Sequence, residues 1–218
     1  MGSEAPILRF RGPFGVPVEV GGSLLLLVLL FVVTGGLDPA LLVYDACFVA
    51  ILVVSILLHE LGHAWGCRVQ GIPVRRIVIH GGGGFCEQER GATARQQELI
   101  VAMGPIVNLA IWALTSLALP YSGGGMLTWF LYWTATINIF LALFNLLPVH
   151  PLDGGKLFHL ALLRILPAST ATRISGGVGL VFAVLWIPAA IWLFLAVGLV
   201  LFFFPPIGLH LQMLRLNR

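Results

Sequence analysis

Long stretches without a charged side chain constrain this chain of 218 residues most strongly. The longest runs from Ile174 to Leu214 without a single Lys, Arg, Asp or Glu. Only 10% of all residues are charged, whereas a soluble domain carries about 25%. These features exclude a water-soluble globule and a disordered chain, and they indicate an integral membrane protein.

The apolar runs predict about six membrane-spanning helices in a single domain over residues 1–218. A span needs about 20 apolar residues, and the run after Ile174 is about twice that length. We therefore expect two crossings with a break near Pro188, and one kinked crossing is the alternative. The expected spans cover about residues 20–37, 44–66, 98–120, 126–147, 174–188 and 189–205.

The positions of the arginines orient these expected spans. Arg9 and Arg11 precede the first span, and five further arginines follow the second span within residues 67–98. The turns around residues 35–45 and 120–125 contain neither Lys nor Arg. The positive-inside rule then predicts a multi-pass protein whose N-terminus is cytoplasmic, together with the loops on the same side, such as residues 67–98. Because the few basic residues are spread among the loops, we expect no nucleic acid as a partner.

The segment HELGH at residues 59–63 is the sharpest chemical pattern in the chain. Residues four apart lie on one face of a helix, so His59 and His63 can direct their imidazoles to one metal ion. Glu60 lies beside that ion, where it can take a proton from a metal-bound water. The alternative is a polar helix end at the membrane surface. It fits poorly, because His59 lies ~13 Å before Arg68 along a helix.

A catalytic zinc site needs a third protein ligand and one open position. Asp153 is the only acidic residue after Glu98, and it ends the fourth apolar run on the side expected for the HELGH segment. From spacing alone, Asp153 either binds the metal or caps a short helix. His150 and His80 are rival ligands. The remaining histidines are expected at membrane interfaces: His159 and His210.

Taken together, the motifs resemble the site-2 protease family of intramembrane zinc metalloproteases. HELGH is followed by NLLP at residues 145–148 and LDG at 152–154, similar to the family's Asn-x-x-Pro and Leu-Asp-Gly elements. Residues 77–85 resemble the family's re-entrant β segment, and GPIVN at 104–108 resembles its Gly-Pro-x-x-Asn. The resemblance covers about residues 10–175.

The resemblance implies an all-α polytopic membrane protein with a small re-entrant β element after the HExxH helix, as a minimal core without CBS or PDZ domains. It implies a zinc-dependent intramembrane endopeptidase in which Glu60 activates a zinc-bound water. His59, His63 and Asp153 would hold one Zn2+ per chain. The substrate would be a single-span membrane protein or a signal-peptide-like segment in the lipid bilayer of a bacterial or archaeal cell.

Five residues are expected to contact the substrate. In the family, the asparagine that matches Asn145 is linked to the substrate backbone or the oxyanion, and a hydrogen bond between helices is its alternative role. An edge strand at residues 76–80 could capture an unwound peptide by strand addition, next to the glycines at 81–84. The expected substrate contacts are Asn145, Asn108, Ile79, His80 and Gly82.

Two other functions fit parts of the pattern. One is a catalytically silent zinc-binding scaffold, which the intact Glu60 disfavours. The other is a metal transporter, which is disfavoured because the acidic groups are confined to one zone rather than placed at several depths. His150 stands where the family more often has a proline or another apolar residue, so it could perturb the metal site.

Overall fold

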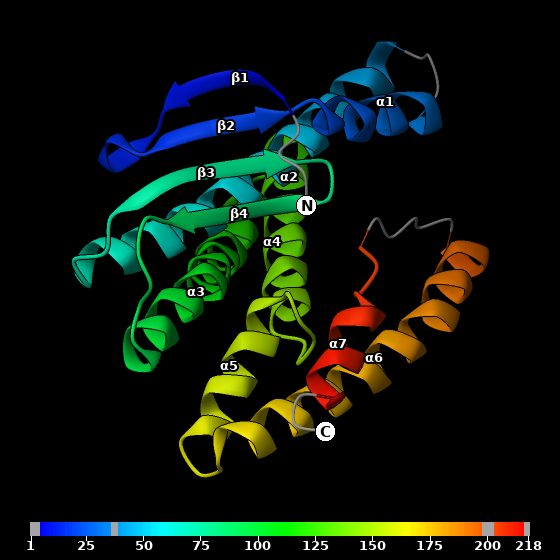
Figure 1. The fold of residues 1–218 in the computed structure, drawn as a ribbon. Helices are drawn as coiled ribbons and strands as arrows, with labels where there is room; N and C mark the ends of the chain where they lie inside the picture. Colours follow the sequence, from blue (N-terminus) through cyan, green and yellow to red (C-terminus); the bar gives the residue numbers. More distant parts are fainter. Residues whose placement is uncertain (1–4, 36–38, 198–202, 216–218) are drawn as a thin grey trace. The chain divides into compact units, whose positions relative to one another are not determined.

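The computed structural model describes residues 5–35, 39–197 and 203–215, and Figure 1 traces the fold. The chain forms two compact units, residues 1–142 and 143–218, and each is described by itself. The elements of the first unit are β1 (Pro6–Arg11), β2 (Pro17–Gly21), α1 (Ser23–Gly35), α2 (Pro39–Val69), β3 (Val74–His80), β4 (Gly83–Gln88), α3 (Ala94–Ala118) and most of α4 (Gly125–Asn145). The second unit holds the end of α4, then α5 (Asp153–Leu163), α6 (Ala168–Val197) and α7 (Ile207–Arg215).

A four-stranded mixed sheet, in the order β1-β2-β3-β4, lies in the first unit (Figure 1). β2 is antiparallel to β1 and parallel to β3, and β4 returns antiparallel to β3. The parallel pair joins Val18 to Ile77 across the chain that contains α1 and α2. The small β element expected after the HExxH helix is therefore confirmed as β3 and β4, and the N-terminal pair β1–β2 enlarges it.

Apolar side chains fix the sheet against α2, the helix that carries HELGH. Each fully buried aliphatic side chain contributes about 1.5–3 kcal/mol through the hydrophobic effect. The cluster therefore holds the C-terminal half of α2 against the sheet. Its buried members are Val16, Val18, Ile77 and Ile79 from the sheet side, and Leu61 and Ala64 from α2.

Glycines let α2 and α3 approach closely. A Cβ atom on Gly62 would lie 2.6 Å from the carbonyl oxygen of Met103, and one on Gly66 would lie 2.9 Å from the Cα of Ile100. Small residues of this kind allow backbones to approach one another in membrane helix pairs. The backbone of α3 is thereby brought beside the histidines of α2.

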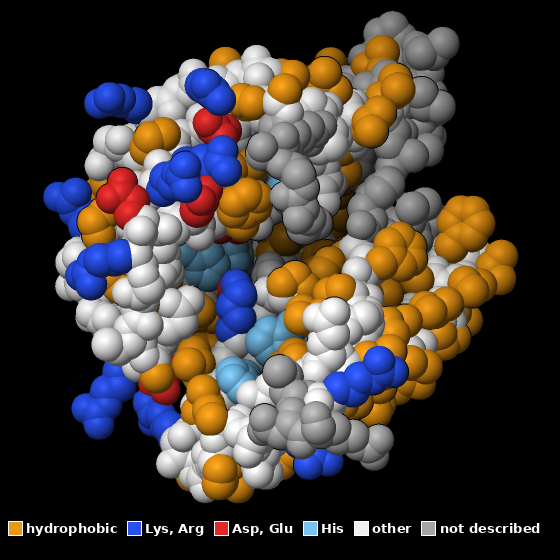
Figure 2. Space-filling view, viewed as in Figure 1, with side chains coloured by type: hydrophobic (Ala, Val, Ile, Leu, Met, Phe, Trp, Pro, Cys, Tyr) orange, Lys and Arg blue, Asp and Glu red, His pale blue; other side chains and the backbone are white. Residues whose placement is uncertain are grey.

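Ion pairs join the strands on the polar side of the sheet. Arg76 on β3 donates to Glu87 on β4 at 2.6 Å and to Glu19 on β2 at 2.8 Å. The hydrogen bond from Arg76 holds the pKa of Glu87 below its usual value. Figure 2 shows charged side chains gathered over this sheet, while apolar side chains run along α6 of the other unit.

Four helices in the described part of the chain are long and apolar enough to cross a membrane. They confirm a mostly helical membrane fold, whereas a count of six spans is not reached among these residues. The four segments are Leu41–Val69, Ala94–Tyr121, Gly125–Asn145 and Ala168–Ala196.

Two of the expected spans differ from the structure. Of the first, expected at residues 20–37, only the 13 residues of α1 are helical, and residues 36–38 lie outside the described part. The expected break at Pro188 is wrong, because α6 continues through it to Val197. Neighbouring groups can satisfy the backbone at a proline within a membrane helix, so Pro188 need not end it. The separate span at 189–205 is therefore not formed, and residues 198–202 of it are outside the described part.

Candidate metal centre

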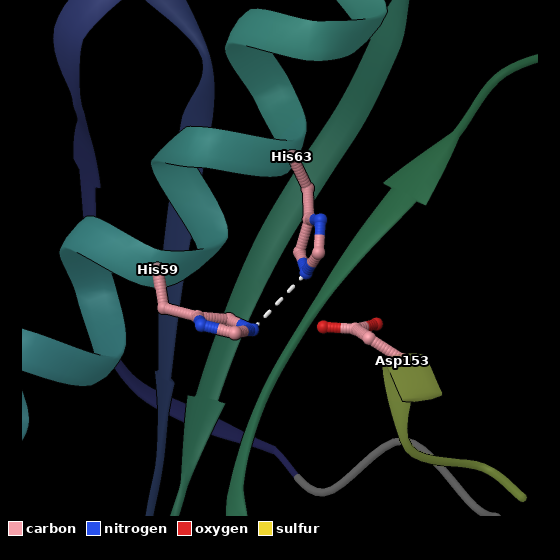
Figure 3. A group of neighbouring side chains, drawn as sticks. All are labelled: His59, His63 and Asp153. Carbon is pink, nitrogen blue, oxygen red and sulfur yellow. Dashed lines mark hydrogen bonds between the residues drawn. The ribbon is translucent and has the colours of Figure 1, made fainter. Parts of the chain in front are cut away.

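His59 and His63 lie one turn apart on α2, and their rings face each other. Their Nε2 atoms are 3.2 Å apart, and both side chains are buried. A dashed line marks this contact in Figure 3. Two ring nitrogens at this separation can bind one ion between them, because zinc–nitrogen bonds are about 2.0–2.1 Å long. The i, i+4 spacing of the sequence motif is thus realised on one helix face.

The second ring nitrogen of each histidine is engaged by α3. His59 Nδ1 lies 2.5 Å from the side-chain oxygen of Asn108, and His63 Nδ1 lies 2.8 Å from the carbonyl oxygen of Ile100. Because both neighbours are acceptors, each Nδ1–H donates, and each Nε2 keeps its lone pair for a metal. Such partners fix the tautomer and the ring orientation of metal-binding histidines.

Asn108 is part of a buried polar chain that links three helices. Its amide nitrogen donates to Asn138 on α4 at 2.7 Å, and the amide nitrogen of Asn138 donates to the hydroxyl of Ser55 on α2 at 2.9 Å. Asn108 and Asn138 are 0% exposed. The expected substrate contact at Asn108 is therefore wrong, since its amide is engaged with His59 and neighbouring helices. The structure instead shows Asn108 in hydrogen bonds that join α3 to its neighbouring helices.

Replacing Asn108 by alanine is expected to weaken zinc binding by about 10–100-fold, the usual effect of losing an outer partner of a metal-bound histidine. His59 would lose the acceptor that fixes its tautomer, while His63 would keep the Ile100 carbonyl. The zinc dissociation constant, measured by competition with a chelator, tests this. Thr115→Ala is the matched control, because Thr115 also lies on α3 but bonds only to carbonyls of its own helix. Unchanged affinity in Asn108→Ala would contradict the orienting role.

Gly104 on α3 lies beside the two histidines and has no side chain to fill the space next to them. A Cβ atom there would contact His63 Cε1, and it would lie 2.5 Å from His63 Nε2 and 2.6 Å from His59 Nε2. A side chain at this position would therefore occupy the space in front of both donor atoms. Sequence reasoning matched Gly104 only as part of the GPIVN segment and did not assign it to the site.

Glu60 lies against the main chain of β4. Its side chain is 5% exposed, and a Cβ atom on Gly84 would lie 2.8 Å from Glu60 Cγ and 3.0 Å from its Oε1. The glycine thus lets the strand pass directly over the carboxylate. Gly84 was not predicted as a site residue, whereas the predicted Gly82 lies in the exposed turn before β4.

The edge strand expected at residues 76–80 is wrong. These residues belong to β3, which pairs with β2 on one side and β4 on the other. Ile79 is 1% exposed within the apolar cluster, so it does not face a substrate. His80 accepts a hydrogen bond from the backbone of Gly82 at 3.1 Å. Among the described strands, β4 has the open edge on this side of the sheet.

Asp153 is the first residue of α5 and is 4% exposed. Leu152 holds the cap position of this helix, and Asp153 lies inside its first turn rather than at the cap. Lys156 donates to Asp153 Oδ1 at 3.3 Å. A Cβ atom on Gly155 would lie 2.6 Å from the backbone nitrogen of His150, so the glycine holds the start of α5 tightly against the preceding turn. Asn145 ends α4.

His59, His63 and Asp153 form a group that could hold a metal ion, and Figure 3 draws their side chains. Two imidazoles and one carboxylate match the ligands of catalytic zinc sites, which keep a fourth position open. The lone pairs of the two Nε2 atoms, and the space that Gly104 leaves in front of them, also fit a metal ion bound between these residues. Within the described residues, neither rival ligand, His80 or His150, belongs to this group.

Comparisons with known proteins find zinc metalloproteases among the proteins similar to this chain. The model of Peptidase family M50 matches residues 47–126 and 122–186. A zinc metalloprotease of Methanocaldococcus jannaschii is 24% identical over 174 residues, which cover 79% of this chain and 50% of the relative. Stage IV sporulation protein FB of Bacillus subtilis is 30% identical over 140 residues, covering 62% of this chain and 46% of that one. The chain thus spans about half the length of these curated relatives.

A solved structure shows the same fold. The site-2 protease from Methanocaldococcus jannaschii matches with a TM-score of 0.65 at 20% identity, over 95% of this chain and 91% of that one. The family model covers more than half of the sequence and includes the HELGH segment and Asp153. The resemblance seen in the sequence is therefore confirmed, and the chain belongs to peptidase family M50, the site-2 protease family of membrane zinc metalloproteases.

Proposed function

We propose that this chain is a zinc-dependent endopeptidase that hydrolyses a peptide bond within or near a transmembrane segment of its substrate. The observation that carries the proposal is the pair of buried histidines on α2, each with its Nδ1 fixed by an acceptor, next to the buried Glu60. α2 is also long and apolar enough to span a membrane. A buried carboxylate and two imidazoles in such a helix are costly and mark a functional site.

The residues have separate roles in this proposal. His59, His63 and Asp153 would hold Zn2+, and Asn108 would keep His59 in the correct tautomer. A zinc ion in such a site polarises a substrate carbonyl and lowers the pKa of water towards ~7. Glu60 would accept a proton from the attacking water and then donate it to the leaving amine.

The open edge of β4 offers a place for the substrate backbone. A helical substrate must unwind before cleavage, and its freed N–H and C=O groups need partners that lipid does not provide. Pairing with β4 would supply them by strand addition. Because Gly84 brings the same strand against Glu60, a bound peptide would lie beside the catalytic carboxylate. The substrate class we propose is a single-span protein or a signal-peptide-like segment, with Asn145 as a further predicted contact.

Metal removal tests the proposed activity. Purified protein in detergent should cleave a fluorescent single-span substrate, lose this activity after treatment with a zinc chelator, and regain it when Zn2+ is added back. A sample carried through the same dialysis without chelator is the control. Full cleavage by protein shown to be metal-free by elemental analysis would contradict a zinc mechanism. Stoichiometric zinc without any cleavage would favour the silent scaffold.

We also propose that the loop between β4 and α3 is cytoplasmic and that the turn after α3 lies on the opposite side of the membrane. The arginines that flank the sheet support this orientation. In a background without native cysteines, Tyr121→Cys should react with an impermeant thiol reagent on intact cells. Glu89→Cys should react only after permeabilisation. Both residues are exposed, so the two variants control for each other, and the reverse pattern would contradict the orientation.

A further inference from the structure

Three imidazoles from three segments of the second unit gather away from the HELGH motif. His150 lies in the turn before α5, His159 lies on α5, and His210 lies on α7. The ring centroid of His150 is 6.1 Å from that of His159 and 6.2 Å from that of His210. We call these residues the histidine cluster.

Three ring nitrogens of the histidine cluster lack a hydrogen-bond partner. His210 is 0% exposed, and neither of its ring nitrogens has a hydrogen-bond partner. The buried Nδ1 atom of His159 has none either. Within the described residues, these are three of the four buried side-chain nitrogen or oxygen atoms left without a partner. Buried polar atoms are normally paired, so their concentration at one place indicates a missing ligand.

The chain is shaped to hold the His210 ring where it is. A Cβ atom on Gly179 of α6 would contact Cε1 and Nδ1 of His210 and lie 3.1 Å from its Nε2. On the same helix, the hydroxyl of the fully buried Ser175 lies 3.4 Å from His150 Nε2. The His210 ring is therefore packed into a notch of α6.

The charge state of the cluster suits metal binding. Burial lowers the pKa of His150 to about 4, and the neighbouring His159, His210 and Lys156 lower it further by charge repulsion. Burial also lowers the pKa of His210 below its usual value. A backbone hydrogen bond with His150 opposes this shift at His210.

We propose that His150, His159 and His210 form a second metal site that binds a divalent transition-metal ion such as Zn2+. Imidazole nitrogen suits zinc, copper and nickel, and a single ion would provide a partner for a nitrogen of each ring. Two imidazoles on one tetrahedral zinc have centroids about 5 Å apart, since zinc–nitrogen bonds are about 2.0–2.1 Å long. The rings of His159 and His210 would therefore have to move towards His150 by about 1 Å when the ion binds, because the donor atoms of the described cluster are not yet close enough to share one ion.

Metal stoichiometry of the purified full chain tests this second site separately from the family site. After equilibration with excess Zn2+ and removal of free metal, the unmodified chain should hold two zinc ions by elemental analysis. His210→Leu and His159→Gln should each hold one, as should His63→Ala, which removes the other ion. The double variant of His63 and His210 should hold none. His80→Gln is the control, because it removes a histidine outside both sites and should keep two.

Thermal unfolding gives a second readout for variants that fold poorly. Added Zn2+ should raise the Tm of His63→Ala, which keeps the histidine cluster, but not that of the double variant. His159 is only partly buried, so His159→Gln remains informative if His210→Leu does not fold. One zinc per unmodified chain at saturation would overturn the proposal, as would two zinc ions in both cluster variants. The zinc content of His63→Ala tests the site of His59, His63 and Asp153. Failure of that site can therefore be told apart from failure of the histidine cluster.

Discussion

Replacing Glu60 by glutamine is expected to reduce peptide hydrolysis by about 10²–10⁴-fold, the usual contribution of a general acid–base residue. Glutamine has nearly the same size, so the packing against Gly84 should survive. Its amide cannot take a proton from water, and the neutral group cannot return one to the leaving amine. Cleavage of a single-span substrate by purified protein, measured as an initial rate at saturating zinc, gives the size of the loss.

The same variant should keep its zinc, because Glu60 is placed beside the donor atoms rather than among them. Zinc per chain is measured on the folded, detergent-purified protein by elemental analysis. Glu89→Gln makes the same chemical change at an exposed position and should leave both zinc content and cleavage unchanged. Loss of zinc from Glu60→Gln would show that this carboxylate is a ligand, and the proposed mechanism would then be wrong.

The second large effect is expected for Asp153→Asn. A helix cap would tolerate this change, because asparagine caps about as well as aspartate. A metal ligand would not, since an anionic oxygen on a dication is replaced by a neutral amide. We expect zinc affinity to fall by more than the about 10–100-fold caused by losing an outer partner. Cleavage should fall with it, while the helical circular dichroism signal is retained.

Asp45→Asn provides the matched control for this experiment. It changes the other aspartate of the described chain, which lies near the start of α2 and outside the metal group. Zinc dissociation constants of the two variants are compared with the unmodified chain by chelator competition. Full zinc content and full cleavage in Asp153→Asn would move the third ligand to another residue, and the site would have to be redrawn.

The parts of this site that were predictable from the sequence are those with a local chemical pattern. His59, Glu60 and His63 lie within five residues of one helix, and their spacing alone places two donors on one face. Asp153 stood out because charged residues are so rare in the second half of the chain. The membrane class followed equally directly from the long apolar runs, because nothing but lipid accommodates so much exposed apolar surface.

What could not be predicted depends on contacts between distant segments. The pairing of β2 with β3 joins residues almost sixty positions apart, so the N-terminal strands gave no local signal of their partners. Gly84 and Gly104 matter because of what a side chain there would strike, and this is visible only once strand, helix and histidines are together. The break predicted at Pro188 failed for a different reason. Proline usually ends or kinks a helix in water, but α6 has 30 residues and continues past Pro188.

The main-chain partner of His63 has a consequence for mutational studies of this chain. The carbonyl of Ile100 persists whatever side chain stands at that position, whereas the oxygen that holds His59 belongs to Asn108 and can be deleted. A saturation scan will therefore report position 100 as tolerant of other apolar residues and position 108 as intolerant. The two hydrogen bonds orient their histidines in the same way, but only the one to the Asn108 side chain can be removed by a single substitution. Loss of the bond to the Ile100 carbonyl would require a shift of the α3 backbone.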